Sequence, residues 1–219
     1  MRKSILTPSQ QKILTFLSKD KTFLKYFYLT GGTALAEYYL HHRLSEDLDF
    51  FSTTEIDPQW ITSLVTQLTK KLPITSVDRR EVFNRNLVFF NIGNTTVKTE
   101  FTYFPSPQIE VPKITNGIPV DSLTDIATNK FFTIYQKPSA RHFIDLYLLL
   151  TQKDYLLSDL EKLARIKFDT AIDPIQLGSQ LIKANNISDL PHMLIKLPED
   201  KWRKYWLKQA KTLKERIKK

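Results

Sequence analysis

The stretch Asp47-Leu48-Asp49-Phe50-Phe51 decides the fold, because two carboxylates flank one apolar residue at the start of a strand-like run. Alternate side chains of a strand point to the same face, so we expect Asp47 and Asp49 on one face and their apolar neighbours in the core. Two acids roughly 7 Å apart along the backbone can bind the same divalent ions, and Mg²⁺ in phosphate chemistry prefers carboxylate oxygen. A lone Asp-x-Asp is more often a polar strand end, so the surrounding motifs decide its meaning.

A glycine pair lies about one helix upstream of these acids. Residues 26–29 predict a buried strand, Thr30-Gly31-Gly32-Thr33 a tight turn, and residues 34–40 a helix. Glycines let the backbone approach a ligand, and a helix N-terminus offers free N–H groups to an anion, so this turn is predicted to hold a triphosphate. Arg43 and Ser45 precede the acidic strand in a loop that could reach the same nucleotide; ordinary solvation is the alternative. The chain contains no P-loop or dinucleotide glycine motif.

A third acid is expected on an adjacent strand. Residues 86–92 and 97–104 read as two strands joined at Gly93-Asn94, which predicts a hairpin. Glu100 then lies in the middle of the second strand, where a charged side chain needs a partner or water. An exposed sheet face would also supply that water, so a purely structural position is the alternative.

These motifs resemble the nucleotidyltransferase superfamily, and within it the abortive-infection toxins of the AbiEii/AbiGii type. The resemblance rests on residues 31–36, residues 42–51, and Lys130 followed by residues 141–146. It implies an α+β fold, with a nucleotidyltransferase-type mixed β-sheet, flanking helices and a helical C-terminal region. It also implies transfer of a nucleoside monophosphate from a nucleoside triphosphate, with Mg²⁺ or Mn²⁺, to an acceptor that is the 3′ end of tRNA in some relatives. A cognate antitoxin is the implied protein partner.

The resemblance assigns roles to particular residues. Metal ions would be bridged by Asp47 and Asp49, with Glu100 completing the shell of the ion nearest the acceptor. The nucleotide would be bound by Gly31, Gly32, Thr33, Arg43, Ser45 and Lys130. Lys130, in a helix predicted over residues 122–136, would stabilise charge on the triphosphate, although a helical lysine is usually a solvated surface residue.

Asp145 is the last catalytic residue that the resemblance implies. Its helix is apolar almost all round, and burying an unpaired acid costs several kcal/mol, so Asp145 needs a partner such as Lys130 or Arg141. A structural salt bridge and an active-site role are both consistent with this pattern. The family often has Arg-Asp where this chain has Arg141-His142, which puts any catalytic role of position 142 in doubt.

The composition narrows the class of protein. A chain of 219 residues can fill one substantial core or two small ones, and 42% of its residues are hydrophobic. It contains no cysteine, which excludes disulfides, zinc-thiolate sites and thiol nucleophiles and suits a reducing compartment. No apolar stretch approaches the roughly 18 residues of a membrane span. We therefore expect a cytoplasmic protein with no membrane partner.

Positive charge is concentrated at the C-terminal end. Of the net charge of +9, residues 201–219 contribute +8, from nine Lys or Arg and one Glu. Trp202, Trp206, Ala210, Leu213 and Ile217 recur at helical spacing, which predicts an amphipathic helix with its lysines on the other face. That face could contact RNA, with Trp or Tyr side chains stacking on bases, although lysines are more often solvated and tryptophans more often core.

The chain is expected to form a nucleotidyltransferase α/β core over residues 1–120 and a helical domain over residues 121–219 that completes the active site. After residue 122 the pattern predicts only helices, over residues 122–136, 139–151, 158–167, 174–184 and 199–217. Two other functions remain open: a nucleotide- or RNA-binding protein of the same fold without turnover, and a transferase that modifies a small molecule of the antibiotic type. Asp47, Asp49 and Glu100 together weigh against the first, and the basic tail favours RNA over the second.

Overall fold

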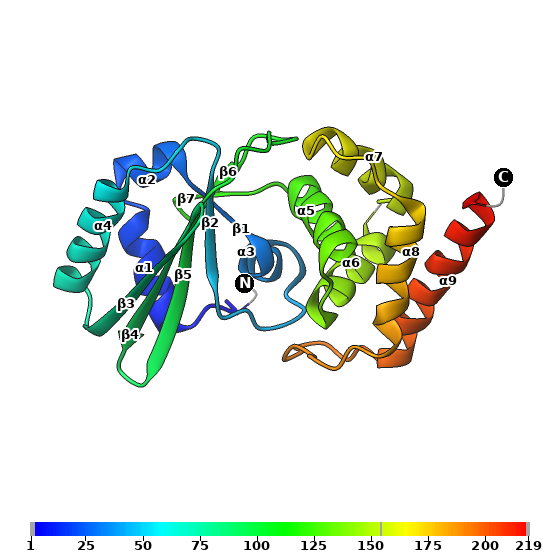
Figure 1. Ribbon diagram of the computed structural model, residues 1–219. Coiled ribbons are helices and arrows are strands. Elements are labelled where there is room, and N and C mark those ends of the chain that lie inside the picture. The colour runs from blue at the N-terminus through cyan, green and yellow to red at the C-terminus, as the bar shows by residue number, and fades with distance from the viewer. Residues whose placement is uncertain (1–2, 154, 218–219) are drawn as a thin grey trace. The chain divides into compact units, whose positions relative to one another are not determined.

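The computed structural model describes residues 3–153 and 155–217, with side chains described up to residue 213. The chain divides into two compact units, Met1–Leu123 and Thr124–Lys219, each of which is shown in Figure 1. The first unit holds the sheet and the second is helical, which confirms the predicted α+β class. The predicted domain boundary at residue 120 stays a prediction. Within the described residues, no helix is long and apolar enough to cross a membrane.

The first unit is built on a seven-stranded mixed sheet in the order β3-β4-β5-β2-β1-β7-β6. Only the central pair β5–β2 and the pair β1–β7 are parallel, and every other pair is antiparallel. The strands are β1 (Tyr28–Thr30), β2 (Leu48–Ser52), β3 (Ile74–Val82), β4 (Arg85–Ile92), β5 (Thr95–Tyr103), β6 (Lys113–Thr115) and β7 (Ile118–Val120). The predicted hairpin over residues 86–104 is confirmed as β4 and β5.

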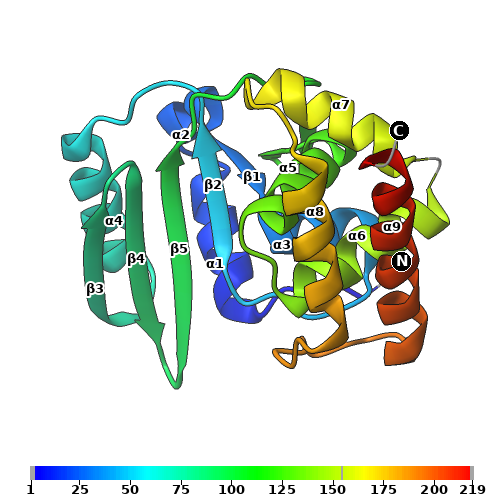
Figure 2. The ribbon, with the colours of Figure 1, turned by 45° about the vertical axis from the view of Figure 1, so that its right-hand side comes forward.

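Three helices lie along one side of this sheet in both ribbon views (Figures 1 and 2): α1 (Pro8–Leu17), α2 (Lys21–Tyr26) and α4 (Pro58–Lys71). Helix α1 begins at a capping box formed by Thr7 and Gln10, with Pro8 at the first helical position. Beneath the helices an aromatic cluster fills the core, in which Phe50 stacks on Phe101 and contacts Phe23 edge to face. The opposite face of the sheet therefore carries the polar side chains.

The glycine segment differs from its prediction. Residues 30–33 do not form a separate turn, because a helix begins directly at Gly31 as α3 (Gly31–Leu35) and continues as the π-helical segment η1 (Ala36–Leu40). The chain changes direction between β1 and α3 at Gly31, whose φ of 71° lies in the left-handed region that favours glycine. The preceding strand is shorter than predicted, since Tyr26 ends α2 and β1 begins at Tyr28.

The second unit consists of helices joined by short loops. They are α5 (Leu123–Gln136), α6 (Ala140–Gln152), α7 (Leu157–Lys167), α8 (Pro174–Ile182), the 3₁₀ turn η2 (Lys183–Asn185) and α9 (Glu199–Ile217). The five predicted helices are confirmed, with ends that differ by a few residues. Buried ion pairs join α5 to α6 through Lys130 and Asp145, and α5 to α7 through Asp125 and Lys167.

Helix α9 confirms the predicted amphipathic pattern and corrects one interpretation of it. Trp202 and Trp206 are buried, and the Trp206 indole N–H donates to the Phe143 carbonyl at 3.0 Å. The idea that these tryptophans stack on bases is therefore wrong, because the core holds both rings. Tyr205 is half-buried against Tyr147. Ile217, the last residue of the predicted stripe, lies outside the described side chains.

Candidate active site

Strands β2 and β5 bring two of the predicted acids together. Asp49 pairs in register with Glu100 across the parallel ladder, so their side chains leave the same face of the sheet. The neighbouring pair, Phe50 with Phe101, points to the other face and is fully buried. The burial of this apolar pair fixes which face of each strand the acids occupy.

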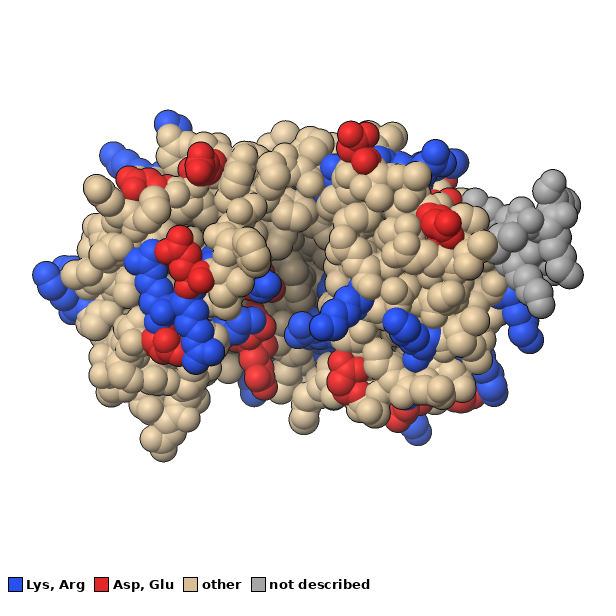
Figure 3. Space-filling view, in the orientation of Figure 1, with Lys and Arg blue, Asp and Glu red and all other residues tan. Residues whose placement is uncertain are grey.

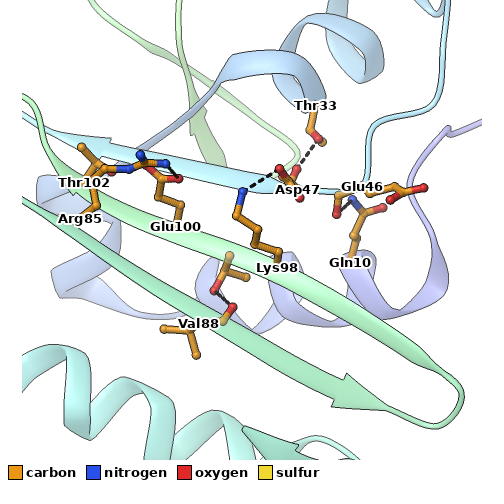
Figure 4. A network of polar contacts seen from close by, with 10 residues as sticks. Gln10, Thr33, Glu46, Asp47, Arg85, Val88, Lys98, Glu100 and Thr102 are labelled. Atoms are coloured by element: carbon orange, nitrogen blue, oxygen red, sulfur yellow. Dashed lines mark hydrogen bonds and ion pairs between the residues drawn. The ribbon is translucent and has the colours of Figure 1, made fainter. Parts of the chain in front are cut away.

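Asp47 lies one residue before β2, and its carboxylate meets a lysine on β5. The Lys98 ammonium nitrogen is 2.9 Å from Asp47 Oδ2 (Figure 4). Lys98 and Glu100 are two residues apart on β5, and therefore share a face. The ion pair thus places Asp47 beside the same face as Asp49 and Glu100.

Glu100 is held by three donors. Arg85 at the start of β4 donates to both carboxylate oxygens at 2.6 Å, and the Thr102 hydroxyl donates to Oε1 at 2.7 Å (Figure 4). Burial on its own would raise the pKa of Glu100, but the hydrogen bonds from Arg85 and Thr102 and the charges of Arg85 and Lys98 outweigh it and lower the pKa. The hydrogen bond to Glu100 is also the main cause that raises the pKa of Arg85. Glu100 is therefore ionised at neutral pH.

The glycine pair packs closely against Asp49 and against the loop before β2. A Cβ atom on Gly31 would overlap the carboxylate of Asp49, and one on Gly32 would lie 2.6 Å from Arg43 Nη2 and 3.0 Å from Ser45 Oγ. Gly31 also has a positive φ of 71°, so that position favours glycine, whereas a side chain at position 32 would displace the ends of the Arg43 and Ser45 side chains. The structure brings Gly31 to Asp49, and Gly32 to Arg43 and Ser45, as a shared nucleotide site would need.

The loop that carries Asp47 is tied down by two side chains. The Thr33 hydroxyl donates to the Asp47 carbonyl, and the Gln10 amide on α1 donates to the Glu46 carbonyl at 3.0 Å (Figure 4). The same amide also donates to the Ser45 carbonyl at 3.0 Å. Thr33 is fully buried and Gln10 nearly so. Thr33 thus positions the acidic loop, and its predicted contact with a nucleotide stays a prediction.

The remaining predicted site residues belong to the second unit. Lys130 Nζ lies 2.6 Å from Asp145 Oδ2, so Asp145 finds the first of its two predicted partners, while Arg141 is exposed. The roles of Lys130 and Asp145 beside the nucleotide stay predictions.

His142 has a structural task. Its Nδ1 accepts a hydrogen bond from the Ser139 backbone N–H at 3.2 Å and lies 3.0 Å from the Ser139 hydroxyl, at the third position of α6. This is a capping box in which an imidazole stands where a carboxylate or amide is usual. The departure from the family pattern is thus accommodated at a helix start.

Sequence reasoning missed Lys98, Arg85 and Gln10. The signal for Lys98 was present, because a residue two positions before Glu100 shares its face in any strand. Arg85 could have been found by counting back from the predicted hairpin turn, which sets Arg85 opposite Thr102. No local pattern points from Gln10 to the carbonyl groups of a loop 35 residues away.

Three comparisons place the chain among known proteins. Residues 15–216 match the family model described as Nucleotidyl transferase AbiEii toxin, Type IV TA system. An uncharacterized protein of Aquifex aeolicus is 35% identical over 144 residues, which cover 65% of this chain. The match spans 66% of that relative's length.

Solved structures share the fold. A crystal structure of an H. pylori protein assigned as a nucleotidyltransferase superposes with a TM-score of 0.63 at 18% identity, over 97% of this chain and 98% of that one. JHP933 from Helicobacter pylori gives 0.58 at 19% identity, covering 95% and 90%. MenT4, a nucleotidyltransferase toxin of Mycobacterium tuberculosis, gives 0.60 at 16% identity, covering 94% and 82%.

Proposed function

Because this chain belongs to the AbiEii family of nucleotidyltransferase toxins, we propose that its acidic sheet face transfers a nucleoside monophosphate from a nucleoside triphosphate to an RNA acceptor. The family supplies the class of enzyme, and the residues supply the roles. Asp47, Asp49 and Glu100 act as the carboxylate ligands of divalent metal ions. The Gly31-Gly32 segment, with Arg43 and Ser45, receives the triphosphate.

The observation that carries this proposal is the registered pair Asp49 and Glu100, with the Asp49 carboxylate against Gly31. Acids on neighbouring strands are like charges, and holding them on one face costs free energy unless cations compensate. Here Lys98 pairs with Asp47 and Arg85 pairs with Glu100, and the charge of Arg85 also acts on Asp49. A face arranged in this way is suited to a ligand of high positive charge.

The donor set fits Mg²⁺ by chemistry. All three proposed ligands are carboxylates, the oxygen donors that Mg²⁺ prefers. Asp49 and Glu100 leave one face of two adjacent strands, and Asp47 lies beside that face. Among the described residues, no three His, Asp or Glu side chains already converge as a metal site. Asp47 is instead turned to Lys98, so a metal ion at Asp47 requires exchange of that partner. Glu100 is turned to Arg85 and Thr102, whose three hydrogen bonds leave a carboxylate lone pair for an ion. The chemistry supplied by bound Mg²⁺ would be neutralisation of the triphosphate and a lower pKa of the attacking hydroxyl.

The rest of the site works through positioning and charge. Thr33 and Gln10 fix the backbone of the acidic loop, which limits how far Asp47 moves when its partner changes. Arg85 keeps Glu100 ionised and oriented. Phosphoryl transfer depends mainly on such positioning and electrostatics, so these residues support the reaction without taking part in bond making.

The choice of RNA as the acceptor, with the 3′ end of tRNA first, rests on charge. Helix α9 exposes Lys201, Lys204, Lys208 and Lys211, which recur along the helix opposite its buried tryptophans. Such a face attracts a phosphate backbone. On the face in Figure 3, by contrast, Lys and Arg lie among Asp and Glu over the strands of the first unit. A cognate antitoxin is the further partner that a toxin family suggests.

The test is label transfer. Wild type is incubated with each α-labelled triphosphate, Mg²⁺ and total tRNA, beside Asp49→Asn and the control Asp78→Asn. Asp78 is an exposed acid on β3 that pairs with Arg80. We expect labelled RNA from wild type and from the control, and a loss of roughly 10³-fold in Asp49→Asn, since metal ligation is worth several kcal/mol.

The alternatives give different products. Label on the protein itself would replace the RNA acceptor with self-modification, and label on an aminoglycoside but not on RNA would identify a small-molecule transferase. Triphosphate binding without transfer to any acceptor would support the non-catalytic alternative. Acceptor binding that falls steeply with salt indicates a polyanion, because bound phosphates release counterions.

A further inference from the structure

Two of the described ion pairs join a cation to an acid of the sheet face, and the proposed reaction gives a role to the cation of one pair. Arg85 orients Glu100, whereas Lys98 is paired with Asp47, a proposed metal ligand. A divalent ion that binds Asp47 must compete with the Lys98 ammonium for the same carboxylate oxygen. Lys98 therefore needs another anion once the metal is bound.

The Arg85–Glu100 pair has features that resist separation. Both guanidinium hydrogen bonds to Glu100 are 2.6 Å long and Thr102 adds a third donor. The Glu100 side chain is only 7% exposed, although that of Arg85 is 50% exposed, so the number and geometry of the hydrogen bonds hold the pair. A bidentate guanidinium–carboxylate pair has fixed geometry and is among the stronger side-chain interactions. Glu100 consequently has no oxygen without a donor to offer a displaced lysine.

The Lys98–Asp47 pair has features that allow Lys98 to change partners. It consists of one contact of 2.9 Å, and 29% of the Lys98 side chain and 30% of the Asp47 side chain are exposed. An ammonium is a compact charge on a flexible four-carbon stem, so it can change partner with little rearrangement. Partly exposed pairs contribute less to stability than buried ones, so release of Lys98 costs little free energy.

The geometry points to Lys98 as a positioning residue that leaves Asp47 for a phosphate oxygen when a metal-bound triphosphate enters, an inference that rests on the proposed function. The divalent ion at Asp47 repels Lys98, and both oxygens of Glu100 already accept hydrogen bonds from Arg85 or Thr102. The triphosphate that shares the metal supplies a new anion for Lys98. Lys98 thereby opposes metal binding without nucleotide and favours metal binding with it.

Two binding measurements on Lys98→Met test this exchange. Mn²⁺ is titrated without nucleotide and followed by electron paramagnetic resonance, and the affinity for a labelled triphosphate is measured with Mn²⁺ present. We expect the Mn²⁺ affinity to rise roughly tenfold, because a competing charge is gone, and the triphosphate affinity to fall by about the same factor. Lys98→Arg should return both affinities most of the way to wild type.

The matched control is Lys162→Met, which removes an exposed lysine that pairs with Asp159 on α7 at 3.1 Å. Both of its affinities should equal those of wild type. The melting temperature of Lys98→Met should stay near that of wild type, and Lys98→Gln gives the same test if the methionine variant does not fold.

The two affinities must move in opposite directions. If both fall, both stay unchanged, or Mn²⁺ binding rises while triphosphate binding is unaffected, Lys98 does not exchange between these partners. Such a result alongside normal RNA labelling by wild type would overturn this inference alone. Wild type that binds neither Mn²⁺ nor triphosphate would overturn the proposed function and the inference together.

Discussion

The carboxylates of the two units are neutralised in different surroundings. In the sheet unit, Asp47 and Lys98 meet at a partly exposed face where water reaches both groups. In the helical unit, Asp125 and Lys167 lie between α5 and α7 with 0% and 1% of their side chains exposed. A partly exposed pair can dissociate into water, whereas separation of the buried pair leaves two charges in an apolar interior.

This difference shows that burial decides the role of an ion pair. A partly exposed pair can change partners, whereas a fully buried pair holds packed helices together. Lys130 and Asp145 stand between these extremes. Asp145 is fully buried, but 8% of the Lys130 side chain remains exposed, against 1% for Lys167. This residual exposure is what a lysine needs if it is to act on a ligand while a buried acid orients it.

The largest effect is expected from breaking the buried pairs. Lys167→Met leaves the Asp125 carboxylate in the interior without this cation, so the free energy of unfolding should fall by about 3–5 kcal/mol. Lys130→Met should cost a similar amount, because Asp145 is just as buried. Urea unfolding of both variants measures this, and Lys98→Met, with its partly exposed pair, should lose less than about 1 kcal/mol.

Activity then separates the two lysines. The resemblance gives Lys130 a role on the triphosphate and gives Lys167 none, so label transfer per folded molecule should fall roughly 10²-fold in Lys130→Met and stay unchanged in Lys167→Met. Equal rates per folded molecule in both variants would make Lys130 a packing residue like Lys167.

Much of the acidic face follows from strand periodicity alone. The alternation of Asp49 with Phe50, and of Glu100 with Phe101, already separates a polar from an apolar face on each strand. The sequence does not reveal that β2 and β5 are neighbours, because they are separated by α4 and two strands. Their register, which places Asp49 beside Glu100, is a tertiary property.

The helical unit shows the same limit. Helical spacing predicted the apolar stripe of α9 but not which residues cover it, so it left open whether Trp202 and Trp206 were core or surface residues. Phe143 on α6 packs against both rings, which places them in the core. The pairing of Asp125 with Lys167, 42 residues apart, has no local signal at all. Partners of buried charges are chosen by packing, which a single sequence does not display.

A smaller effect is expected from acid titration of the sheet face. The pKa of Glu100 lies below its ordinary value of 4.5, so the unfolded chain binds more protons near that pH and stability rises with pH. The contribution of Glu100 is fully present above about pH 4.5 and is lost as the pH falls through the lowered pKa.

Urea unfolding from about pH 7 down to about pH 3 should therefore show wild type more stable than Glu100→Gln at neutral pH and a shrinking difference toward acid. A difference that stays constant or grows on acidification would mean that Arg85 does not stabilise the charged carboxylate. Protonation of Glu100 would then not break its pair with Arg85.

The smallest effect is expected at His142, which tests whether a departure from the family pattern belongs to the chemistry or to the scaffold. His142→Ala removes the acceptor of the Ser139 N–H at the start of α6, so the free energy of unfolding should fall by about 0.5–1 kcal/mol with label transfer unchanged. His142→Asp should recover that stability, because a carboxylate in the first turn accepts the same N–H and favours the helix dipole. Loss of transfer without loss of stability in His142→Ala would instead place the imidazole in the reaction. The start of α6 would then belong to the reacting part of the molecule, and not only to its scaffold.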